Sequence, residues 1–519
     1  MKKTPALLVI MDGFGLASGN PESLSDHPSN SRSDGASNGE NGENHDDSRF
    51  DAIRAAKTPC LDRLQREYAL TALSASGNDV GFPAGQPGRA AAGCMNIGAG
   101  RIVYQDLVRI SRAVADGSFY QNPVFIQAMN DCLTHSSALH LIGVLSDTGS
   151  YSHIGHLFAL LKMAVEFNLK HIYLHLILEG RDERGLAICR ELLRRLTEHI
   201  HELNAEEKIR IATLMGLSRV TGNVDALESA YDAMVYGESD ERNLNSENIF
   251  NILSDLKVCE DLEPVICAPD CSISDHDALI FWSFRPLKNL ARAFADPDFE
   301  LFTRQIFPLT RVSFSDYQVP GVSVAFPNPV IRNTIGEYLS ALGLTQLRIA
   351  KASRFDEIGY YLNGCAAGIF PGEDRISEFS SASEIGSACI RRMESGAYDL
   401  IILGLPDCEE AILTGSPERV TQAVETIDAC IGAVADAALK MGGIVIVTAS
   451  CGGAESLNLS DSRLIRDHDG TTNPVPFLLC GAGSKLRSGG RLSDIAPTLL
   501  DLMGLACPDE MDGKTLIVE

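Results

Sequence analysis

The sequence lacks any run of about 18 or more apolar residues, the length that a membrane-spanning helix requires. It is also poor in basic residues, because 44 Lys and Arg stand against 69 Asp and Glu and give a formal net charge of −25 over 519 residues. Nucleic acids and anionic membranes are bound through basic patches, so this balance argues against both kinds of partner. It leaves open a small anionic substrate, which needs only a few Arg or Lys side chains in one cleft.

The sequence also lacks the dense, closely spaced cysteine framework of small secreted proteins. Its 14 cysteines are spread over a long chain, and this usage fits a reducing cytosol, so we expect a cytoplasmic protein. The apolar stretch from Ala6 to Ile10 imitates a signal peptide, but it is short, and Asp12 follows it without a small-residue cleavage site. A buried parallel strand that ends in an acidic loop is the better interpretation.

Residues 17–49 differ from the rest of the chain in composition. The hydrophobic fraction of the whole sequence is 45%, typical of a globular core, and the length predicts two or three domains. In 17–49, however, Ser, Asn, Gly and Asp dominate, and Leu24 is the one large apolar residue. Such a segment buries too little apolar area to offset its ordering entropy. We expect a disordered acidic insertion, either a passive loop or a tether for a partner.

Elsewhere, short apolar runs alternate with stretches whose apolar residues recur three and four positions apart. The pattern predicts helices over 156–166 and 185–199 and buried strands over 7–11, 139–144, 172–178, 209–214, 400–403 and 444–447. This alternation is typical of an α/β protein with mainly parallel sheets. Ligand sites in such sheets gather at the carboxyl ends of the strands. The residues expected at those ends are Asp12, Asp147, Asp182, the segment 405–409, Ser450 and Cys451.

Ordered short motifs occur along almost the whole chain. They are LVIMDGFG at 8–15, AKTPCLDRL at 56–64, NIGAGR at 96–101, LSD at 145–147, SHI at 152–154, GRD at 180–182, SFRP at 283–286, QLRIA at 346–350, FPGEDR at 370–375, TNPVPF at 472–477 and DIAPTLL at 494–500. In this order they resemble the cofactor-independent (2,3-bisphosphoglycerate-independent) phosphoglycerate mutases of the alkaline phosphatase superfamily. The insertion 17–49 is the main interruption of the resemblance.

The resemblance implies a fold, a domain organisation and a reaction. An alkaline-phosphatase-like, metal-binding domain with a mainly parallel sheet would combine 1–104 and 329–519. A second α/β domain of transferase type, 105–328, would be inserted within it, with the substrate in the cleft between them. Members of the family are cytoplasmic, monomeric isomerases of glycolysis that interconvert 2- and 3-phosphoglycerate. Their chemistry needs a nucleophilic Ser, two Mn²⁺ or Mg²⁺ ions, and Arg and Lys side chains that clamp the phosphate and the carboxylate.

The nucleophile is missing from its place in the family pattern. Where the family has Gly-Asn-Ser-Glu-Val-Gly-His, this chain reads GRAAAGC at 88–94. Ala90 therefore occupies the Ser position and Cys94 the His position. Because Ala90 carries no oxygen, no phosphoserine can form there.

Most of the metal-ligand positions that the resemblance implies have also changed. Asp12 is retained, and Glu409 replaces an Asp with a carboxylate of longer reach. The residues at lost ligand positions are Leu413 for His, Ser450 for Asp, Cys451 for His and Gly470 for His. Transition-metal sites generally need three or more protein ligands. We therefore expect no bound metal cofactor.

The transferase side is altered less. Tyr151 stands at a family His position, and Leu217 and Asn223 stand at two Arg positions. The retained or conservatively replaced polar residues are Arg181, Asp182, Arg285, Lys288 (for Arg) and Arg354 (for Lys). They either clamp a phosphorylated small acid or form salt bridges between the domains.

These substitutions predict a pseudo-mutase that keeps the family fold and has lost the activity. Such a protein would bind a phosphorylated acid or an unknown protein partner. One alternative is a working mutase in which Ser450 serves as the nucleophile. Another is different chemistry, in which Cys94 and Cys451 form a soft-metal or redox pair with Asp12 and Glu409. The two cysteines can also be inert residues that fill vacated space.

Overall fold

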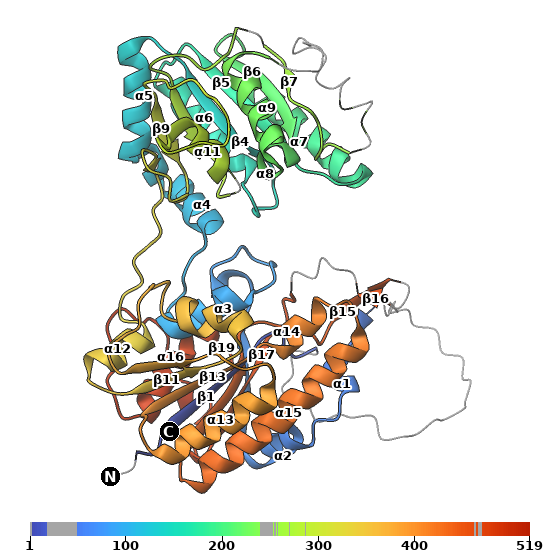
Figure 1. Cartoon of the computed structure of the whole chain (residues 1–519). Coiled ribbons are helices and arrows are strands. Elements are labelled where there is room, and N and C mark those ends of the chain that lie inside the picture. The colour runs from blue at the N-terminus through green and yellow to red at the C-terminus, as the bar shows by residue number, and fades with distance from the viewer. Residues whose placement is uncertain are drawn as a thin grey trace. The chain divides into compact units, whose positions relative to one another are not determined.

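A computed structural model of the chain describes residues 3–17, 49–238, 253, 256, 258–268, 270–285, 287–460, 463–464 and 470–518. Two compact units divide the chain: Met1–Gln105 with Val330–Glu519, and Asp106–Pro329 (Figure 1). The predicted insertion 17–49 lies outside the described residues except for its two end residues. None of the helices within these ranges combines the length and the apolar character that crossing a membrane demands.

The first unit is built on an eight-stranded sheet in the order β12-β11-β13-β1-β14-β17-β3-β19. The strands are β1 Ala6–Met11, β3 Ala69–Ser74, β11 Gln346–Ile349, β12 Glu373–Ile376, β13 Leu400–Leu405, β14 Ile444–Ala449, β17 Val475–Cys480 and β19 Gly490–Arg491. Strand β1 pairs in parallel with both β13 and β14. Strand β17 runs antiparallel to both of its neighbours, β14 and β3.

Strand β1 forms the centre of this sheet because its sequence is apolar throughout. All six residues of Ala6–Met11 are buried, as expected for a parallel strand covered on both faces. Burial of each large aliphatic side chain of the strand contributes about 1.5–3 kcal/mol. The N-terminal apolar stretch is thus a core strand, which confirms the expectation for 7–11.

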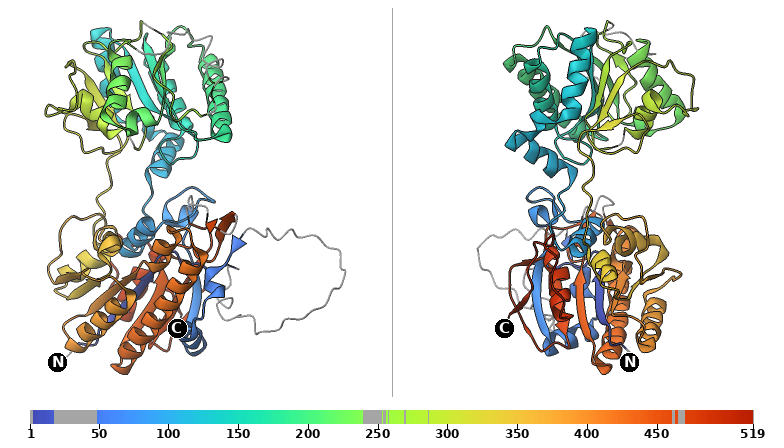
Figure 2. Two further views of the ribbon diagram at one scale, coloured as in Figure 1. Left: turned by 45° about the vertical axis from the view of Figure 1, so that its right-hand side comes forward. Right: turned by 90° about the vertical axis from the view of Figure 1, so that its left-hand side faces the viewer.

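Helices cover this sheet, and α13 and α15 lie side by side on one face (Figures 1 and 2). The long helix α15 begins with a cap, since the Ser416 side chain accepts a hydrogen bond from the backbone N–H of Arg419, and Pro417 occupies its first turn. The helices of the unit are α1 Ala52–Ala55, α2 Pro59–Glu67, α3 Ala90–Ala99, α12 Ile335–Ala341, α13 Ala382–Ser395, α14 Asp407–Ile412, α15 Pro417–Lys440 and α16 Ile495–Leu502.

Two small sheets complete the first unit. One has the order β16-β15-β2 and the other pairs β18 with β20. Their strands are β2 Arg49–Phe50, β15 Leu457–Ser460, β16 Arg463–Leu464, β18 Lys485–Leu486 and β20 Ile517–Val518.

The second unit contains a seven-stranded sheet in the order β10-β9-β8-β4-β5-β6-β7. Its strands are β4 Leu139–Leu145, β5 Ile172–Leu178, β6 Ile209–Gly216, β7 Val265–Ile266, β8 Ala278–Phe281, β9 Thr310–Ser313 and β10 Ser323–Val324. All described pairings are parallel except that of β6 with β7. The helices are α4 Asp106–Asp116, α5 Pro123–His135, α6 Ile154–Glu166, α7 Glu183–Glu202, α8 Ser218–Thr221, α9 Val224–Val235 and α11 Lys288–Ala295.

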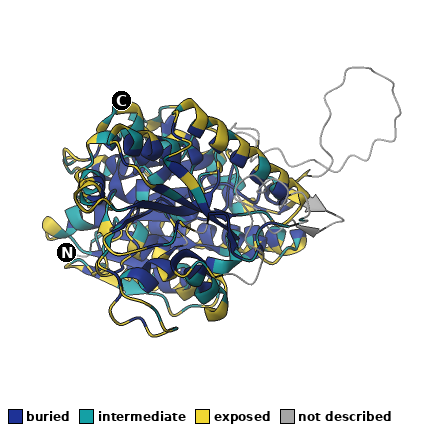
Figure 3. Cartoon of the chain, turned by 90° about the horizontal axis from the view of Figure 1, so that it is seen from above, coloured by how far each residue is buried: buried dark blue, intermediate teal, exposed yellow. Residues whose placement is uncertain are grey.

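The structure confirms the α/β class with mainly parallel sheets, and it confirms all six predicted strands and both predicted helices. Buried residues are concentrated in the strands, and exposed ones lie on the outer sides of the helices (Figure 3). The strands that the pattern did not predict are short or interrupted by polar residues and proline, such as Gln346–Ile349 and Val475–Cys480.

A chain of buried polar side chains crosses the sheet of the second unit. Asp277 Oδ2 lies 3.1 Å from His140 Nε2, whose Nδ1 lies 2.9 Å from Nε2 of His175. His175 Nδ1 in turn lies 2.9 Å from Thr213 Oγ1. Burial, followed by the neighbouring His140, lowers the pKa of His175 well below its usual value. His175 is therefore neutral in the folded protein at neutral pH.

A second histidine of this unit, His156 on α6, is also held neutral. Its Nε2 lies 2.8 Å from the Ser111 hydroxyl oxygen. Burial is the main cause that lowers the pKa of His156 to about 3. Both histidines thus resist protonation only while the unit is folded.

We expect acid to destabilise the second unit. In the unfolded chain a histidine takes up a proton below a pH of about 6.5, whereas His156 stays neutral in the folded protein. The unfolded state therefore binds more protons, and the free energy of unfolding decreases as the pH is lowered. For each such histidine the slope approaches about 1.4 kcal/mol per pH unit. In urea unfolding of the full chain between about pH 7.5 and 5, the variant His156→Gln should show a weaker slope than the wild type.

The matched control is His171→Gln, which changes an exposed histidine and should leave the slope as it is. Equal slopes for wild type and His156→Gln would contradict the assignment of a neutral, buried His156.

Candidate functional site

Three neighbouring strand ends of the first unit carry the candidate site. Met11 of β1 is in register with Leu405 of β13 and with Ala449 of β14, so the segments that follow these three strands start at one edge of the sheet. They contain Asp12, Glu409 and the pair Ser450–Cys451. The prediction that these residues meet at the carboxyl ends of parallel strands is confirmed for the first unit. Asp147 and Asp182 belong to the second unit.

A cavity of about 380 Å³ opens at this edge. Its lining includes six of the predicted site residues: Ala90, Arg354, Glu409, Leu413, Cys451 and Gly470. Asp12 and Ser450 are buried, with 3% and 0% of their surface exposed. Leu413 is 61% exposed, so an apolar side chain lies at the surface where the resemblance implies a histidine.

The buried Asp12 is paired with a hydroxyl rather than left open. Ser450 Oγ donates a short hydrogen bond to Asp12 Oδ1. Burial, followed by repulsion from Glu409, raises the pKa of Asp12 well above its usual value, and the Ser450 bond lowers it only in part. The hydrogen bond from Ser450 thus occupies one oxygen of the Asp12 carboxyl group.

One guanidinium group neutralises the carboxylates of the cavity. Arg354 Nη1 lies 3.2 Å from Glu357 Oε1 and 3.6 Å from Glu409 Oε1. The Oε2 atoms of both glutamates are buried and accept no hydrogen bond from the residues that the structure describes. Burial raises the pKa of both carboxyl groups, although Arg354 opposes it. Positive charge in this cavity therefore comes from an arginine of the chain itself.

Two charged residues of the cavity, Glu357 and Arg89, were not among the predicted site residues. Glu357 begins a short π-helical turn, Glu357–Tyr361, and follows Arg354 by three residues, a spacing that brings side chains together on a helical turn. That spacing is the signal by which the sequence could have indicated Glu357. Arg89 directly precedes Ala90 and lies between Gly88 and α3.

The two cysteines at vacated histidine positions are buried, and Cys94 is fully so. Burial, and then nearby acidic groups, raises the pKa of both thiols. Both are therefore protonated at neutral pH, which makes them weak nucleophiles and weak ligands. Helix α3 approaches this region closely, since a Cβ on Gly93 would lie 2.0 Å from the carbonyl oxygen of Ser450.

Gly470 has a backbone conformation that a histidine at this position would not readily adopt. Its φ is +82°, a conformation that L side chains rarely adopt. A Cβ at this position would lie 2.7 Å from the carbonyl oxygen of Gly88. A histidine could not be restored here without a change of backbone.

The donor set therefore does not fit two divalent ions. Within the part of the chain that the structure describes, no group of three or more His, Cys, Asp or Glu side chains could hold a metal ion. Segment 465–469 lies outside that part. Asp12 and Glu409 remain as carboxylates, but one is bound to Ser450 and the other lies beside Arg354.

The remaining predicted residues belong to the second unit. Arg181 is 82% exposed at its side chain, and its Nε lies 2.7 Å from Glu260 Oε2. Asp182 caps α7 by accepting a hydrogen bond of 2.7 Å from the N–H of Gly185, so it has a structural role. Tyr151 accepts a backbone hydrogen bond from Phe284 at 2.7 Å. Arg285 and Lys288 are exposed, and Lys288 begins α11.

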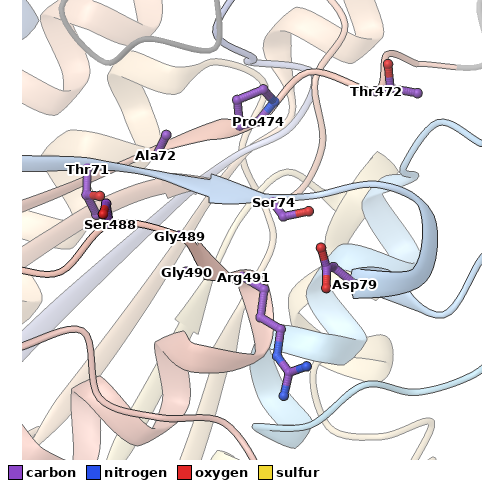
Figure 4. Close-up of a pocket in the computed structure, with 10 residues that line it drawn as sticks. All are labelled: Thr71, Ala72, Ser74, Asp79, Thr472, Pro474, Ser488, Gly489, Gly490 and Arg491. Atoms are coloured by element: carbon purple, nitrogen blue, oxygen red, sulfur yellow. The ribbon is translucent and has the colours of Figure 1, made fainter. Parts of the chain in front are cut away.

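A second cavity of about 530 Å³ lies beside β3 and β19 (Figure 4). Asp79 and Arg491 are its charged residues, and Arg491 Nη2 lies 3.1 Å from Asp512 Oδ1. None of the predicted site residues lines it, so the candidate site remains the cavity at β1, β13 and β14.

Comparison with known proteins identifies the family. A family model for the BPG-independent PGAM N-terminus matches residues 110–319. The 2,3-bisphosphoglycerate-independent phosphoglycerate mutase of Clostridium tetani is 34% identical over 544 residues, covering 100% of this chain and 99% of that protein. The protein belongs to this mutase family. The same-named protein of Acetivibrio thermocellus is 35% identical over 548 residues and covers 100% of both chains.

A solved structure supports the mutase-family fold independently. The Leishmania mexicana phosphoglycerate mutase, crystallised at low cobalt concentration, superimposes with a TM-score of 0.66 and 22% identity, covering 99% of this chain and 98% of that one. The resemblance drawn from the motifs is thus confirmed for family and fold. Whether this member keeps the activity is a separate question, because fold does not imply function.

We expect Arg354→Met to destabilise the first unit by about 1–3 kcal/mol at pH 7, because it leaves the buried Glu357 and the half-buried Glu409 without their cation. Both glutamates have raised pKa values when folded, so the loss should shrink as the pH falls and the carboxyl groups protonate. Urea unfolding of the full chain at several pH values measures this.

The matched control is Arg194→Met, which removes an arginine that bridges Glu191 and Glu198 on an exposed helical face. It should lower the stability much less than Arg354→Met, because exposed ion pairs contribute little. An Arg354→Met variant as stable as the wild type at pH 7 would contradict the role given to Arg354.

Proposed function

We propose that this protein is a catalytically inactive member of the mutase family, which retains the fold and acts by binding a ligand or a protein partner. The observation that carries the proposal is the side-chain set of the 380 Å³ cavity. It presents the methyl group of Ala90 where the family has its nucleophile. Arg89 and Arg354 are its cations, and Arg354 is already paired with Glu357 and Glu409.

The loss of the nucleophilic Ser and the loss of the metal ligands both affect the phosphoryl-transfer step. Phosphoryl transfer in this family needs a hydroxyl that accepts the phosphoryl group and divalent ions that neutralise the phosphate oxygens. Loss of the hydroxyl alone would leave slow hydrolysis by metal-activated water. Asp12 is bound to Ser450, and Leu413 and Gly470 carry no donor side chain, which removes support for that route as well. Losses that act on one transition state are not independent.

A phosphorylated small acid is the ligand class that the retained cations support. Arg285 and Lys288 are both exposed and lie three residues apart at the start of α11, where a helix terminus also favours negative charge. Arg181 adds a third exposed cation in the second unit. The net charge of −25 argues against a nucleic acid or a membrane as partner. We infer a cytoplasmic, monomeric protein from the cysteine usage and the family.

The two catalytic alternatives have less support. Ser450 is fully buried and donates its hydrogen bond to Asp12, which leaves it poorly placed as a nucleophile for a working mutase. A soft-metal or redox site at Cys94 and Cys451 would require thiolates, and the pKa of each thiol is raised. Small residues that fill vacated space account for both cysteines.

We expect no mutase turnover from the full chain supplied with Mn²⁺ or Mg²⁺, and no stoichiometric metal by elemental analysis. The single reversion Ala90→Ser should not restore activity, because it returns a hydroxyl without the ions that activate it. A family member with an intact site serves as the positive control in the same coupled assay. Stoichiometric, tightly bound Mn²⁺ together with turnover would overturn the proposal.

We also expect calorimetric titration to detect binding of 2- or 3-phosphoglycerate at up to millimolar concentration. The double variant Arg285→Met/Lys288→Met should weaken this binding at least several-fold, because each charge-assisted hydrogen bond contributes about 1.5–3 kcal/mol. Arg194→Met, which changes an arginine on an exposed face of α7, is the control and should bind as the wild type. Absence of binding would exclude the small-acid ligand and leave a protein partner as the function of the fold.

A further inference from the structure

Two cysteine thiols of the second unit lie in direct contact. Cys189, on α7, and Cys259, in the described segment 258–268, have sulfur atoms 3.2 Å apart. The two residues are 1% and 0% exposed and are separated by 70 positions in the sequence. Both are free thiols. Their proximity results from the tertiary fold, and the candidate site does not involve either of them.

The surroundings of the pair are built to hold both sulfur atoms. Cys189 Sγ donates to the carbonyl oxygen of Glu179 at 3.0 Å, and Cys259 Sγ lies 3.7 Å from that of Gly180. The backbone N–H groups of Cys259 and Glu260 also donate to the Gly180 carbonyl, at 3.2 and 3.1 Å. A Cβ on Gly180 would lie 2.8 Å from the Cys259 sulfur, so the absence of a side chain there makes room for the thiol.

We propose that Cys189 and Cys259 form a reversible disulfide and are a redox modification site of this protein. A disulfide requires the sulfur atoms to approach to about 2.05 Å, and they already lie 3.2 Å apart on two segments that backbone hydrogen bonds hold together. The oxidant class is a peroxide or a low-molecular-weight disulfide. The redox site at Cys189 and Cys259 does not depend on the function proposed for the 380 Å³ cavity of the first unit.

The chemistry balances with hydrogen peroxide as the oxidant. The Cys259 sulfur attacks one peroxide oxygen, the O–O bond breaks, and a sulfenic acid and one water form. The Cys189 sulfur then attacks the sulfenic sulfur, the S–S bond forms, and the S–O bond breaks with release of a second water. Two thiols and one peroxide thus give one disulfide and two waters, with two electrons passing from sulfur to oxygen.

The hydrogen bond between the thiols decides which sulfur reacts first. The contact with the other thiol lowers the pKa of Cys259 and raises that of Cys189. Since the thiolate is the nucleophile, Cys259 is the attacking sulfur. Burial of both sulfur atoms limits access, so hydrogen peroxide should react faster than the larger oxidised glutathione.

The disulfide would act on the segment that holds Arg181. Glu260, next to Cys259, pairs with Arg181 at 2.7 Å, and Gly180 lies between the two thiols and this ion pair. A bond from Cys259 to α7 would fix Glu260 against the loop that joins β5 to α7. It would also close a loop of about 70 residues, and long loops gain most from such a constraint.

The test uses the full chain under native conditions. The protein is treated with hydrogen peroxide or oxidised glutathione, quenched in acid, alkylated, and digested without reduction. We expect mass spectrometry to find a peptide that joins Cys189 to Cys259, reversed by dithiothreitol. The oxidised protein should also unfold at a temperature several degrees higher than the reduced protein.

The variants Cys189→Ala and Cys259→Ala should each abolish the linked peptide and the rise in unfolding temperature. The control is Cys267→Ala, which changes another buried cysteine of the same unit whose sulfur lies 3.8 Å from the Val265 carbonyl oxygen; it should keep both. If a variant fails to fold, the wild-type peptide map still decides. Recovery of Cys189 and Cys259 as alkylated free thiols, while the exposed Cys365 and Cys507 are oxidised, would overturn the proposal.

Discussion

The parallel pairing of β1 with β13 and β14 is the constraint on which the rest of the first unit depends. All six residues of β1 are buried, and Met11 is aligned with Leu405 on one side and Ala449 on the other. Because a shift of one residue would turn every side chain to the opposite face, this register is strongly specified. It delivers Asp12, Glu409 and Ser450 to a single edge of the sheet. The position of the site is therefore a consequence of strand register.

At that edge several acidic side chains lie close together, and other side chains of the protein compensate their negative charge. Asp12, Glu357 and Glu409 are drawn out of water, and a buried charge is costly unless it is paired. Ser450 donates a hydrogen bond to Asp12, while Arg354 lies between Glu357 and Glu409. The pKa values of all three carboxyl groups are raised, so each group more readily adopts its uncharged form, which is less costly to bury. This internal neutralisation of the carboxyl groups supports our proposal of binding rather than phosphoryl transfer.

The second unit uses buried polar groups differently. Its sheet contains the hydrogen-bonded series from Asp277 through His140 and His175 to Thr213, which makes folding sensitive to acid. Near the loop that carries Arg181, the contact between Cys189 and Cys259 makes the same unit sensitive to oxidation under our proposal. Both features belong to the second unit, whereas the candidate cavity is lined by residues of the first.

The sequence by itself determined the class and the family, and it predicted the substituted positions. Six strands were predicted because each is a short, mostly apolar segment, a signal that needs only neighbouring residues. Gln346–Ile349 and Val475–Cys480 were missed because the first has four residues with Gln and Arg among them, and the second contains Pro. Motif order likewise placed Ala90, Leu413 and Cys451 at family positions. The tertiary structure alone decided that Glu357 shares Arg354 with Glu409, that Gly470 has a left-handed backbone, and that Cys189 touches Cys259. These are contacts or conformations that distant segments impose on one another, and no local pattern of residues encodes which distant side chains packing will bring together.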